Sequence, residues 1–251
     1  MITGLVVELT KLTHAAVARV TGVLIVLGIS LICSAMLLAV DTDDPQLAAK
    51  LGPLIDPGGW VGYLTVAIQV TGAAGLIGYG VVLSWLFSRE FADGTITGLF
   101  AIPLSRRTLA TAKLTVYLMW GLVTALALVL ALILLGLAGG LGPIPPDAAP
   151  AIGRLLGLSI LNLVIATPAA WAATVGRSVL AGIGTTLAIV VASQVSVIAG
   201  TGGWFPFAAP ALWAISTGIT VTPAQLALVA PVAALAITLT LRSWHHLQLD
   251  R

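Results

Sequence analysis

The chain has 251 residues, of which 59% are hydrophobic and only 8% are charged, and its mean hydropathy is +1.12. Soluble domains carry about 25% charged residues, so this composition excludes a water-soluble protein and predicts a single membrane-embedded unit. The net charge of +2 comes without a concentrated basic stripe, which argues against a nucleic-acid partner.

Residues 5–19 predict a short amphipathic helix ahead of the first long apolar run. Its apolar positions at helical spacing are Leu5, Leu9, Leu12 and Ala16. Its charged positions, away from that face, are Glu8, Lys11 and Arg19. A helix of this kind lies flat in the membrane interface, here on the cytoplasmic leaflet. The alternative is a loose juxtamembrane tail.

Six uncharged apolar runs follow along the chain. They are residues 20–40, 61–87, 114–138, 155–174, 179–199 and 222–241. Each reaches the roughly 20 residues that a helix needs to cross the hydrocarbon core, where a helix satisfies the backbone of an open chain. The first run is longer than the roughly 7–15-residue core of a cleavable signal peptide, so we expect it to be retained. The sequence therefore predicts an all-α integral membrane protein with six transmembrane helices in one domain, residues 1–251.

The basic residues predict the orientation of these helices. With the N-terminus inside, the cytoplasmic set is Lys11, Arg19, Arg89, Arg106, Arg107, Lys113, Arg177, Arg242 and Arg251. The outer set is Lys50 and Arg154. Nine residues against two is a strong positive-inside bias, so both termini are predicted to lie in the cytoplasm.

Residues 202–219, between the fifth and sixth runs, are hydrophobic but too short and broken to span. Pro206 and Pro210 interrupt them. Irregular backbone at membrane depth is tolerated only where it is buried in protein or lines a cavity. We therefore expect a broken hairpin on the outer side, either re-entrant or interfacial.

The absence of charged residues from the six runs indicates where the energy for any uphill transport would come from. None of them contains Asp, Glu, Lys, Arg or His, whereas ion-coupled transporters commonly keep ionisable groups near mid-membrane. The sequence also has no Gly-x-x-x-x-Gly-Lys-Ser/Thr phosphate loop, no metal-binding His/Cys cluster and no catalytic Ser/His/Asp set. We therefore expect no enzyme chemistry in this chain, and we expect any uphill transport to draw its energy from a partner.

Polar side chains inside the runs are candidates for a substrate path. They are Gln69, Thr71, Asn162, Ser193, Gln194 and Ser196. The alternative is hydrogen bonding between helices, worth roughly 0.6–2 kcal/mol for each bond. Gly72, Gly75 and Gly78 recur every three residues in the second run and allow close helix packing, either within the chain or between subunits.

Residues 88–113, between the second and third runs, predict a cytoplasmic coupling segment. They hold six of the chain's twenty charged residues. Gly94 permits a turn, Thr95 can cap a short helix, and Ser105 can cap the next one. The short helix has an apolar patch made of Ile96, Leu99, Phe100 and Ile102, and Pro103 ends it. Such a helix suits docking into a groove of a partner; the alternative is a re-entry loop whose basic residues only fix the topology.

This segment resembles the loop between helices two and three in the membrane subunits of ABC-2 type ABC exporters. The matching positions are Glu90, Gly94, Thr95, Leu99, Pro103, Ser105, Arg106 and Lys113. Asp93 departs from the pattern, because the family often carries a basic or small residue there. The amphipathic N-terminal segment, the six spans and the broken outer segment extend the resemblance over nearly the whole chain.

The resemblance implies a multi-pass protein of the bacterial cytoplasmic membrane and a set of partners. These would be a separate ATP-binding subunit that holds ATP and Mg, a second permease subunit in a homo- or heterodimer, and the lipid membrane. This chain would hold no cofactor itself. The residues implied to couple to the ATP-binding subunit are Glu90, Asp93, Gly94, Thr95, Leu99, Pro103, Ser105, Arg106, Arg107 and Lys113.

The leading hypothesis for function is therefore a permease subunit of an ATP-driven exporter. It would couple ATP hydrolysis by the partner to export of an amphiphilic or hydrophobic substrate. One alternative is a non-transporting membrane scaffold or sensor subunit with the same fold. A second is an ion-coupled secondary transporter, which the neutral spans disfavour.

Overall fold

The computed structural model describes residues 2–40, 58–96, 98 and 105–247, and every regular element within these ranges is helical. The elements are α1 (Ile2–His14), α2 (Ala16–Val23), η1 (Leu24–Gly28), α3 (Ile29–Val40), α5 (Gly59–Val70), η2 (Thr71–Gly75), α6 (Leu76–Ala92), α8 (Arg106–Ala138), α9 (Ala149–Ile165), α10 (Pro168–Val175), α11 (Val179–Ile198), η3 (Gly202–Trp204), α12 (Ala209–Ile215), α13 (Pro223–Ala227) and α14 (Val229–His245). η1 and η2 are π-helical turns, and η3 is a 3₁₀ turn.

Six helical segments among the described residues are long and apolar enough to cross a membrane. They are Ala16–Ala39, Gly59–Ala92, Arg106–Ala138, Ala149–Val175, Val179–Ile198 and Pro223–His245, numbered here as spans 1 to 6. This confirms the predicted all-α fold with six membrane-spanning helices.

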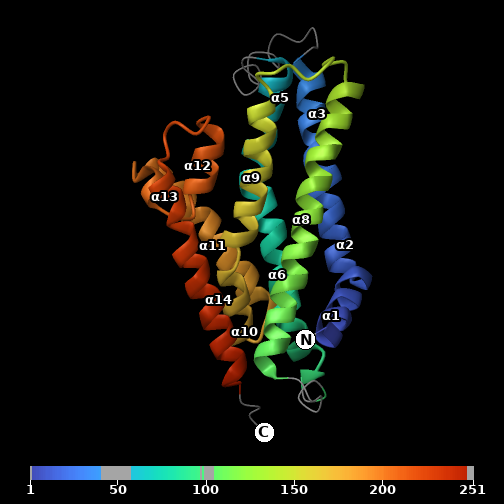
Figure 1. Cartoon of the computed structure of the whole chain (residues 1–251), viewed down its shortest axis with the longest axis vertical. Coiled ribbons are helices and arrows are strands. Elements are labelled where there is room, and N and C mark those ends of the chain that lie inside the picture. Colours follow the sequence, from blue (N-terminus) through green and yellow to red (C-terminus); the bar gives the residue numbers. More distant parts are fainter. Residues whose placement is uncertain (1, 41–57, 97, 99–104, 248–251) are drawn as a thin grey trace.

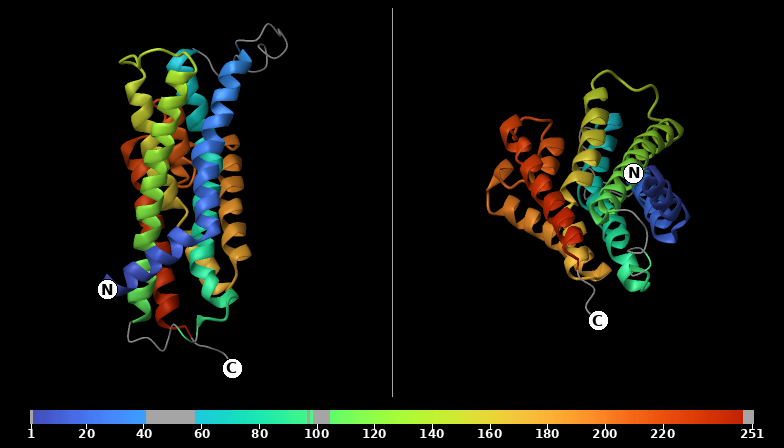
Figure 2. Two further views of the ribbon diagram at one scale, coloured as in Figure 1. Left: turned by 90° about the vertical axis from the view of Figure 1, so that its right-hand side faces the viewer. Right: turned by 60° about the horizontal axis from the view of Figure 1, so that its bottom comes forward.

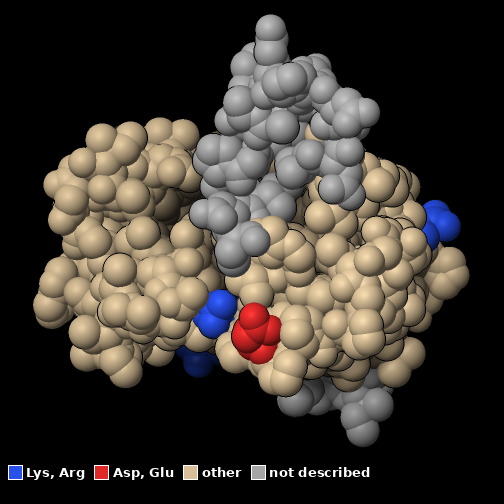
Figure 3. All heavy atoms as spheres, turned by 90° about the horizontal axis from the view of Figure 1, so that it is seen from above, with Lys and Arg blue, Asp and Glu red and all other residues tan. Residues whose placement is uncertain are grey.

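The spans form one elongated bundle (Figure 1). α6 lies at its centre and packs against α2, α8, α9, α10 and α11. We call one end of the bundle basal, because α1, the start of α8 and the end of α14 all lie there, at the bottom of Figure 1. The opposite, distal end is formed by α3, α5 and the start of α9, and its surface is largely uncharged (Figure 3).

Spans 2 and 3 continue past the predicted limits at the basal end. α6 runs to Ala92 rather than to residue 87, and α8 begins at Arg106 rather than at residue 114. A run defined by hydropathy stops short of charged residues, whereas a helix needs only its backbone hydrogen bonds and a cap. Ser105 supplies that cap, because its hydroxyl accepts a hydrogen bond from the backbone N–H of Thr108 at 3.1 Å.

α1 runs across the basal end of the bundle rather than along it (left view of Figure 2). The chain turns at Ala15, whose backbone is extended, and then enters span 1. Three residues of the predicted apolar face pack inward, with Leu12 fully buried and Leu5 and Leu9 half-buried against the core. The fourth, Ala16, lies after the turn and is exposed. The predicted position of Glu8 was wrong: its side chain lies on this packed face and is 1% exposed. At helical spacing Glu8 falls between Leu5 and Leu12, and an ion pair makes its burial possible.

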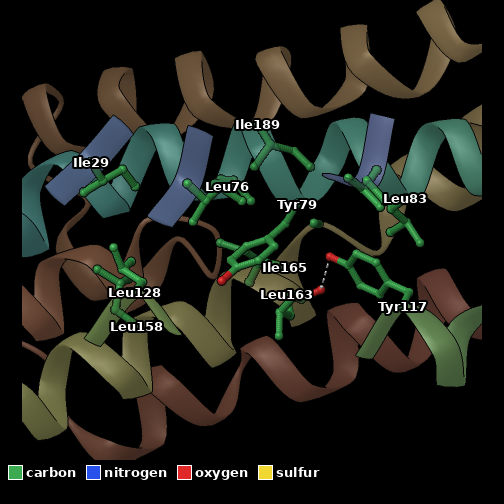
Figure 4. Packing of buried hydrophobic residues seen from close by; sticks show 14 of the residues in the cluster. Ile29, Leu76, Tyr79, Leu83, Tyr117, Leu128, Leu158, Leu163, Ile165 and Ile189 are labelled. Atoms are coloured by element: carbon green, nitrogen blue, oxygen red, sulfur yellow. Dashed lines mark hydrogen bonds between the residues drawn. The ribbon is translucent and has the colours of Figure 1, made fainter. Parts of the chain in front are cut away.

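Span 4 breaks before Pro168, where α9 ends and α10 begins. Proline has no N–H to continue the helical pattern, so the carbonyls before it need other donors. The hydroxyl of Thr167 donates to the carbonyl of Val164 at 2.7 Å. The hydroxyl of Tyr117, from α8, donates to the carbonyl of Leu163 at 3.2 Å (Figure 4). Side chains of the bundle thus supply hydrogen bonds to the carbonyls freed at the break, as expected for a proline inside a membrane-spanning helix.

The segment between spans 5 and 6 forms a broken hairpin of η3, α12 and α13. α12 packs against α9 and α5, with Pro210 in its first turn. α13 begins with a capping box, in which Thr222 and Gln225 each bond to the other's backbone N–H. The hairpin therefore fills space beside the distal half of spans 2 and 4.

The glycines of span 2 face other parts of the same chain. A Cβ atom at Gly78 would lie 2.7 Å from Ile25 of η1, and one at Gly75 would lie 3.4 Å from Asn162 of α9. A Cβ at Gly72 would lie 3.6 Å from Ala211 of α12. This decides the question that the sequence left open, because the close packing along these glycines lies within the chain.

Candidate coupling site and membrane cavity

A cluster of four charged side chains, three of them buried, joins α1, α6 and α8 at the basal end. The Lys113 ammonium donates to Glu8 Oε2 at 2.9 Å, to Glu90 Oε1 at 2.6 Å and to the backbone carbonyl of Leu86 at 3.1 Å. Lys11 contacts Glu8 Oε1 at 2.8 Å and Glu90 Oε1 at 3.4 Å. Lys113, Glu8 and Glu90 are at most 1% exposed. We call these four residues the basal ion cluster.

The charges of the cluster balance, and one carboxylate oxygen, Glu90 Oε2, is buried without a hydrogen-bond partner among the described residues. Two ammonium groups meet two carboxylates, and all three N–H groups of Lys113 have acceptors. Burial alone would raise the pKa of Glu8, but the attraction and hydrogen bonds of Lys113 and Lys11 outweigh it, so the pKa of Glu8 is lowered. Glu8 therefore stays ionised at neutral pH and holds α1 against α8.

Aromatic side chains close the cluster on the side of α14. The Lys113 ammonium lies 5.8 Å from the ring centre of Trp244, which is fully buried. Phe87 and Phe91 of α6 pack edge-on against the same indole, whose N–H donates to the hydroxyl of Thr174 at 3.1 Å. Exclusion of water by these rings strengthens the ion pairs. Trp244 links the cluster to α14 and, through its hydrogen bond to Thr174, to α10.

The other described residues of the predicted coupling set lie nearer the surface. Asp93, Gly94 and Thr95 form an exposed turn after α6, and Gly94 has a φ of +66°, in the left-handed region that glycine adopts without strain. Arg89 and Asp93 lie 3.9 Å apart across one helical turn. Leu99 and Pro103 fall outside the described residues.

Three predicted residues occupy the start of α8. Ser105 is the exposed N-cap described above. The guanidinium of Arg106 donates to the backbone carbonyl of Leu247, just after α14. Arg107 is exposed. Among the described residues, the predicted coupling set therefore divides into a buried pair, Glu90 and Lys113, and a group that is half-buried or exposed.

Sequence reasoning missed Glu8 and Lys11 as partners of Glu90 and Lys113. Glu8 and Lys113 are 105 positions apart in the chain, so no local pattern joins them. The available signal was the position of Glu8 between Leu5 and Leu12, since a carboxylate inside an apolar stripe needs a buried cation.

Four of the six predicted path residues line one small cavity in the membrane-spanning region, which opens on the surface of the chain where Gln69 and Gln194 are exposed. Its volume is about 80 Å³, and its polar lining consists of Gln69, Asn162, Ser193 and Gln194. Its apolar lining includes Leu76 of α6, and Phe207 and Ile215 from the hairpin. Spans 2, 4 and 5 and the hairpin thus converge on an uncharged polar pocket. The remaining two residues, Thr71 and Ser196, are buried beside it and do not line it.

The π-helical turn η2 forms one wall of this cavity. It begins at Thr71, and its Gly72 and Ala73 line the pocket. The Nδ2 of Asn162 donates to the backbone carbonyl of Thr71 at 2.9 Å. π-helical turns disturb the regular hydrogen-bond ladder and often occur at functional sites, and here a side chain from span 4 satisfies the turn. Asn162 therefore has the interhelical role considered from the sequence and also faces the cavity.

Comparison with known proteins places these features in a family context. A family model described as "ABC-2 family transporter protein" matches residues 4–193, which include Glu8, Glu90 and Lys113. A bacitracin transport permease protein, BCRB, of Bacillus licheniformis is 47% identical over 62 residues. That match covers 24% of this chain and 29% of the relative.

Proposed function

The chain belongs to the ABC-2 family of transporter proteins, and from this membership we propose that it is the permease subunit of an ATP-driven exporter. The family and the six apolar helices show that the chain is a membrane subunit of an ABC transporter. It passes several times through the bacterial cytoplasmic membrane. The proposal adds the direction of transport, the partner that hydrolyses ATP with Mg, and a second permease subunit that completes a dimer.

In this proposal the basal end faces the cytoplasm. The described basic residues at that end are Lys11, Arg19, Arg89, Arg106, Arg107, Lys113, Arg177 and Arg242. Arg154 is the described basic residue near the distal end. This distribution supports the orientation through the positive-inside rule.

The observation that carries the coupling proposal is the basal ion cluster. Residues 88–113 connect α6 to α8, and the cluster ties the flanking positions Glu90 and Lys113 to each other and to Glu8 of α1. Removing one partner from a buried ion pair costs about 3–5 kcal/mol, so the three elements resist separation. Closure of the ATP-binding partner against the exposed residues of this segment would therefore displace spans 2 and 3 together with α1.

The substrate in this proposal is an amphiphilic or hydrophobic molecule. The pocket between the spans is uncharged and partly apolar, which disfavours a highly charged cargo. The relative named above is a bacitracin transport permease, which makes bacitracin a suitable first cargo to test on this chain.

The deciding experiment combines purification with transport in vesicles. The chain should co-purify with an ATP-binding subunit whose ATPase activity rises when the permease is present. Inside-out proteoliposomes that hold both should accumulate bacitracin only with hydrolysable ATP. Uphill transport by the chain alone, driven by an ion gradient, would contradict the proposal, as would a stable native complex without any nucleotide-binding subunit.

A further inference from the structure

The central helix α6 is open to its surroundings along a single stripe. Between residues 76 and 90, the side chains that are not buried recur at every fourth position, and they are Ile77, Val81, Trp85 and Arg89. Positions four apart lie on one face of a helix. The stripe therefore leads from apolar side chains within the membrane-spanning region to a cation at the basal end.

The apolar part of this stripe is one wall of a groove between spans 1 and 2. The groove has a volume of about 360 Å³. Span 2 supplies Ala74, Ile77 and Val81, and span 1 supplies Leu24 and Ile25 among others. No charged residue lines it. Because Leu24 and Ala74 are exposed, the groove opens on a face of the bundle that lipid surrounds.

Two π-helical turns shape this groove. η1 and η2 contact each other, and they supply Leu24 and Ala74 to its lining. Such turns interrupt the regular helix and often occur at functional sites. The floor of the groove is closed, because a Cβ atom at Gly78 would lie 2.7 Å from Ile25. Side chains of this chain therefore line and close the groove but leave its volume empty.

The basal end of the stripe carries a cation without a hydrogen bond. The guanidinium of Arg89 lies 4.7 Å from the ring centre of Trp85, within cation–π distance. Its Nε lies 3.9 Å from Asp93 Oδ2, beyond hydrogen-bonding distance. Among the described residues its N–H groups thus have no acceptor, although the side chain is only 24% exposed. A guanidinium is suited to bind phosphate through two parallel hydrogen bonds.

The length of the groove matches one leaflet of a bilayer. Positions 74 and 85 are separated by about 16 Å of helix at 1.5 Å per residue, and half of the hydrocarbon core is about 15 Å thick. Tryptophan is enriched at the boundary between membrane and water. With Trp85 at that boundary, the groove follows the acyl chains, and Arg89, one turn further, lies at the level of the lipid phosphates.

We propose that this groove binds a phospholipid of the basal leaflet, with an acyl chain between spans 1 and 2 and the phosphate on Arg89. The chain meets an apolar lining, and the phosphate meets a guanidinium that has no other acceptor. Basic pockets between membrane-spanning helices bind lipid head groups in this way. The proposal requires only that the bundle spans a membrane, so it goes beyond the proposed export and assigns no cargo.

Charge distinguishes this occupant from a second copy of the chain. The other described carboxylates are Glu8 and Glu90, both buried in the basal ion cluster, and Asp147, just before α9 at the distal end. From its described residues, a second copy could thus bring to Arg89 only its own Asp93, which already neighbours its own arginine. Exchanging one Asp93 for another adds no ion pair, whereas a lipid phosphate adds one.

The test titrates the detergent-purified full-length chain with three probes and counts bound molecules by native mass spectrometry. Dioleoylphosphatidylglycerol has chains and phosphate, dioleoylglycerol has the same chains without phosphate, and glycerol 3-phosphate has the phosphate without chains. The parent should bind the phospholipid more tightly than either. Arg89→Gln should lower affinity for the phospholipid about ten-fold, the effect of losing hydrogen bonds to a charged group, and should leave binding of dioleoylglycerol unchanged.

Two further variants separate the groove from general effects of charge. Ala74→Leu fills the deep end of the groove and leaves Arg89 in place, so it should weaken binding of both dioleoyl probes alike. Arg242→Gln is the matched control. Arg242 is an exposed arginine of α14, and α14 does not line the groove. This variant should bind all three probes as the parent does.

Four results would overturn the assignment. Equal losses in Arg89→Gln and Arg242→Gln would replace a site with diffuse attraction. Equal affinity of the parent for the two dioleoyl probes would show a groove that holds chains without recognising phosphate. Binding of glycerol 3-phosphate as tight as that of the phospholipid would show a site for free phosphate. Loss of dimers in Ala74→Leu and Arg89→Gln, with phospholipid binding intact, would assign the groove to a second copy.

Discussion

Lys113→Met should release α1 from the bundle while leaving the six spans folded. Methionine keeps much of the lysine length but removes the charge, so Glu8 and Glu90 lose contacts at 2.9 and 2.6 Å. All three residues are at most 1% exposed, so solvent does not screen the loss. Breaking such a buried pair costs about 3–5 kcal/mol. The lower end of that range applies, because Lys11 still contacts both carboxylates.

The docking of α1 can be followed through Leu12, which is fully buried in the parent. With Cys33 replaced by alanine, a cysteine at position 12 becomes the only thiol in the chain. Its reaction with a membrane-impermeant maleimide, added from the basal side, reports the fraction of undocked α1. A loss of about 3 kcal/mol should raise the labelling rate roughly 100-fold.

Two variants in the same Leu12→Cys background give this prediction its controls. Arg107→Met removes a charge from the first turn of α8, but this side chain is exposed, so labelling should stay at the parental rate. The triple variant Glu8→Gln, Glu90→Gln, Lys113→Met leaves no uncompensated buried charge among these three positions and should largely restore protection. An unchanged rate in Lys113→Met, or an equal increase in Arg107→Met, would refute the view that the cluster holds α1.

Three more predictions concern pH, the π-helical turn and helix packing. The pKa of Glu8 is depressed below its ordinary value of 4.5, so docking should be constant from pH 7 to about 4.5 and weaken as the pH falls through the lowered pKa; spin-label mobility on α1 measures this. Asn162→Leu leaves the Thr71 carbonyl without its side-chain donor and should cost about 1–3 kcal/mol in detergent unfolding. Gly80→Ala places a Cβ against the buried side chain of Thr186 of α11 and should cost about 1–3 kcal/mol, whereas Gly28→Ala, with nothing within 4 Å, should be tolerated.

Each of these predictions has an outcome that would contradict it. Release of α1 well above pH 4.5 would show that the carboxylate of Glu8 is not held ionised by its lysines. For the π-helical turn, Thr240→Val is the comparison, since this buried hydroxyl donates to Ala236 within its own helix. Equal stability losses in Asn162→Leu and Thr240→Val would remove the special role of the asparagine. Equal losses in Gly80→Ala and Gly28→Ala would mean that close packing of α6 on α11 is not what the glycine provides.

The membrane fold was predictable because its signals are local. Twenty apolar residues in a row define a span regardless of what packs against it, and Ser105 was expected to cap α8 from its position alone. The breaks within spans depend on less local contacts. Pro168 predicts a break in span 4 from the sequence, but the hydroxyl that donates to the freed carbonyl of Leu163 belongs to Tyr117, in another helix.

The candidate sites were only partly predictable because they depend on contacts between distant segments. The sequence predicted Glu90 and Lys113 as coupling residues because they belong to a charged loop, and such a loop suggested a surface for a partner. Their burial depends on Glu8, a residue in a separate helix. Likewise, composition identified Gln69 and Asn162 as polar residues in apolar runs, but only the packing of spans 2, 4 and 5 brings them to one cavity.

Two continuous sets of contacts connect the basal ion cluster to that cavity. One follows span 2, in which Glu90 and Thr71 are separated by about 28 Å of continuous helix. The other follows α8 for one turn from Lys113 to Tyr117, whose hydroxyl donates to the carbonyl of Leu163, next to Asn162 (Figure 4).

Asn162 connects the two sets of contacts, because its side chain donates a hydrogen bond to the backbone carbonyl of Thr71 at the π-helical turn. Spans 2 and 3 are thus joined at the cluster, and span 4 connects them again beside the cavity. Packed helices joined at two points move more readily together than past one another. Phe207, on the opposite wall, belongs to the hairpin between spans 5 and 6. In the proposed exporter, displacement of the joined spans relative to this hairpin would change the width of the cavity and so carry movement from the basal end to the candidate substrate path.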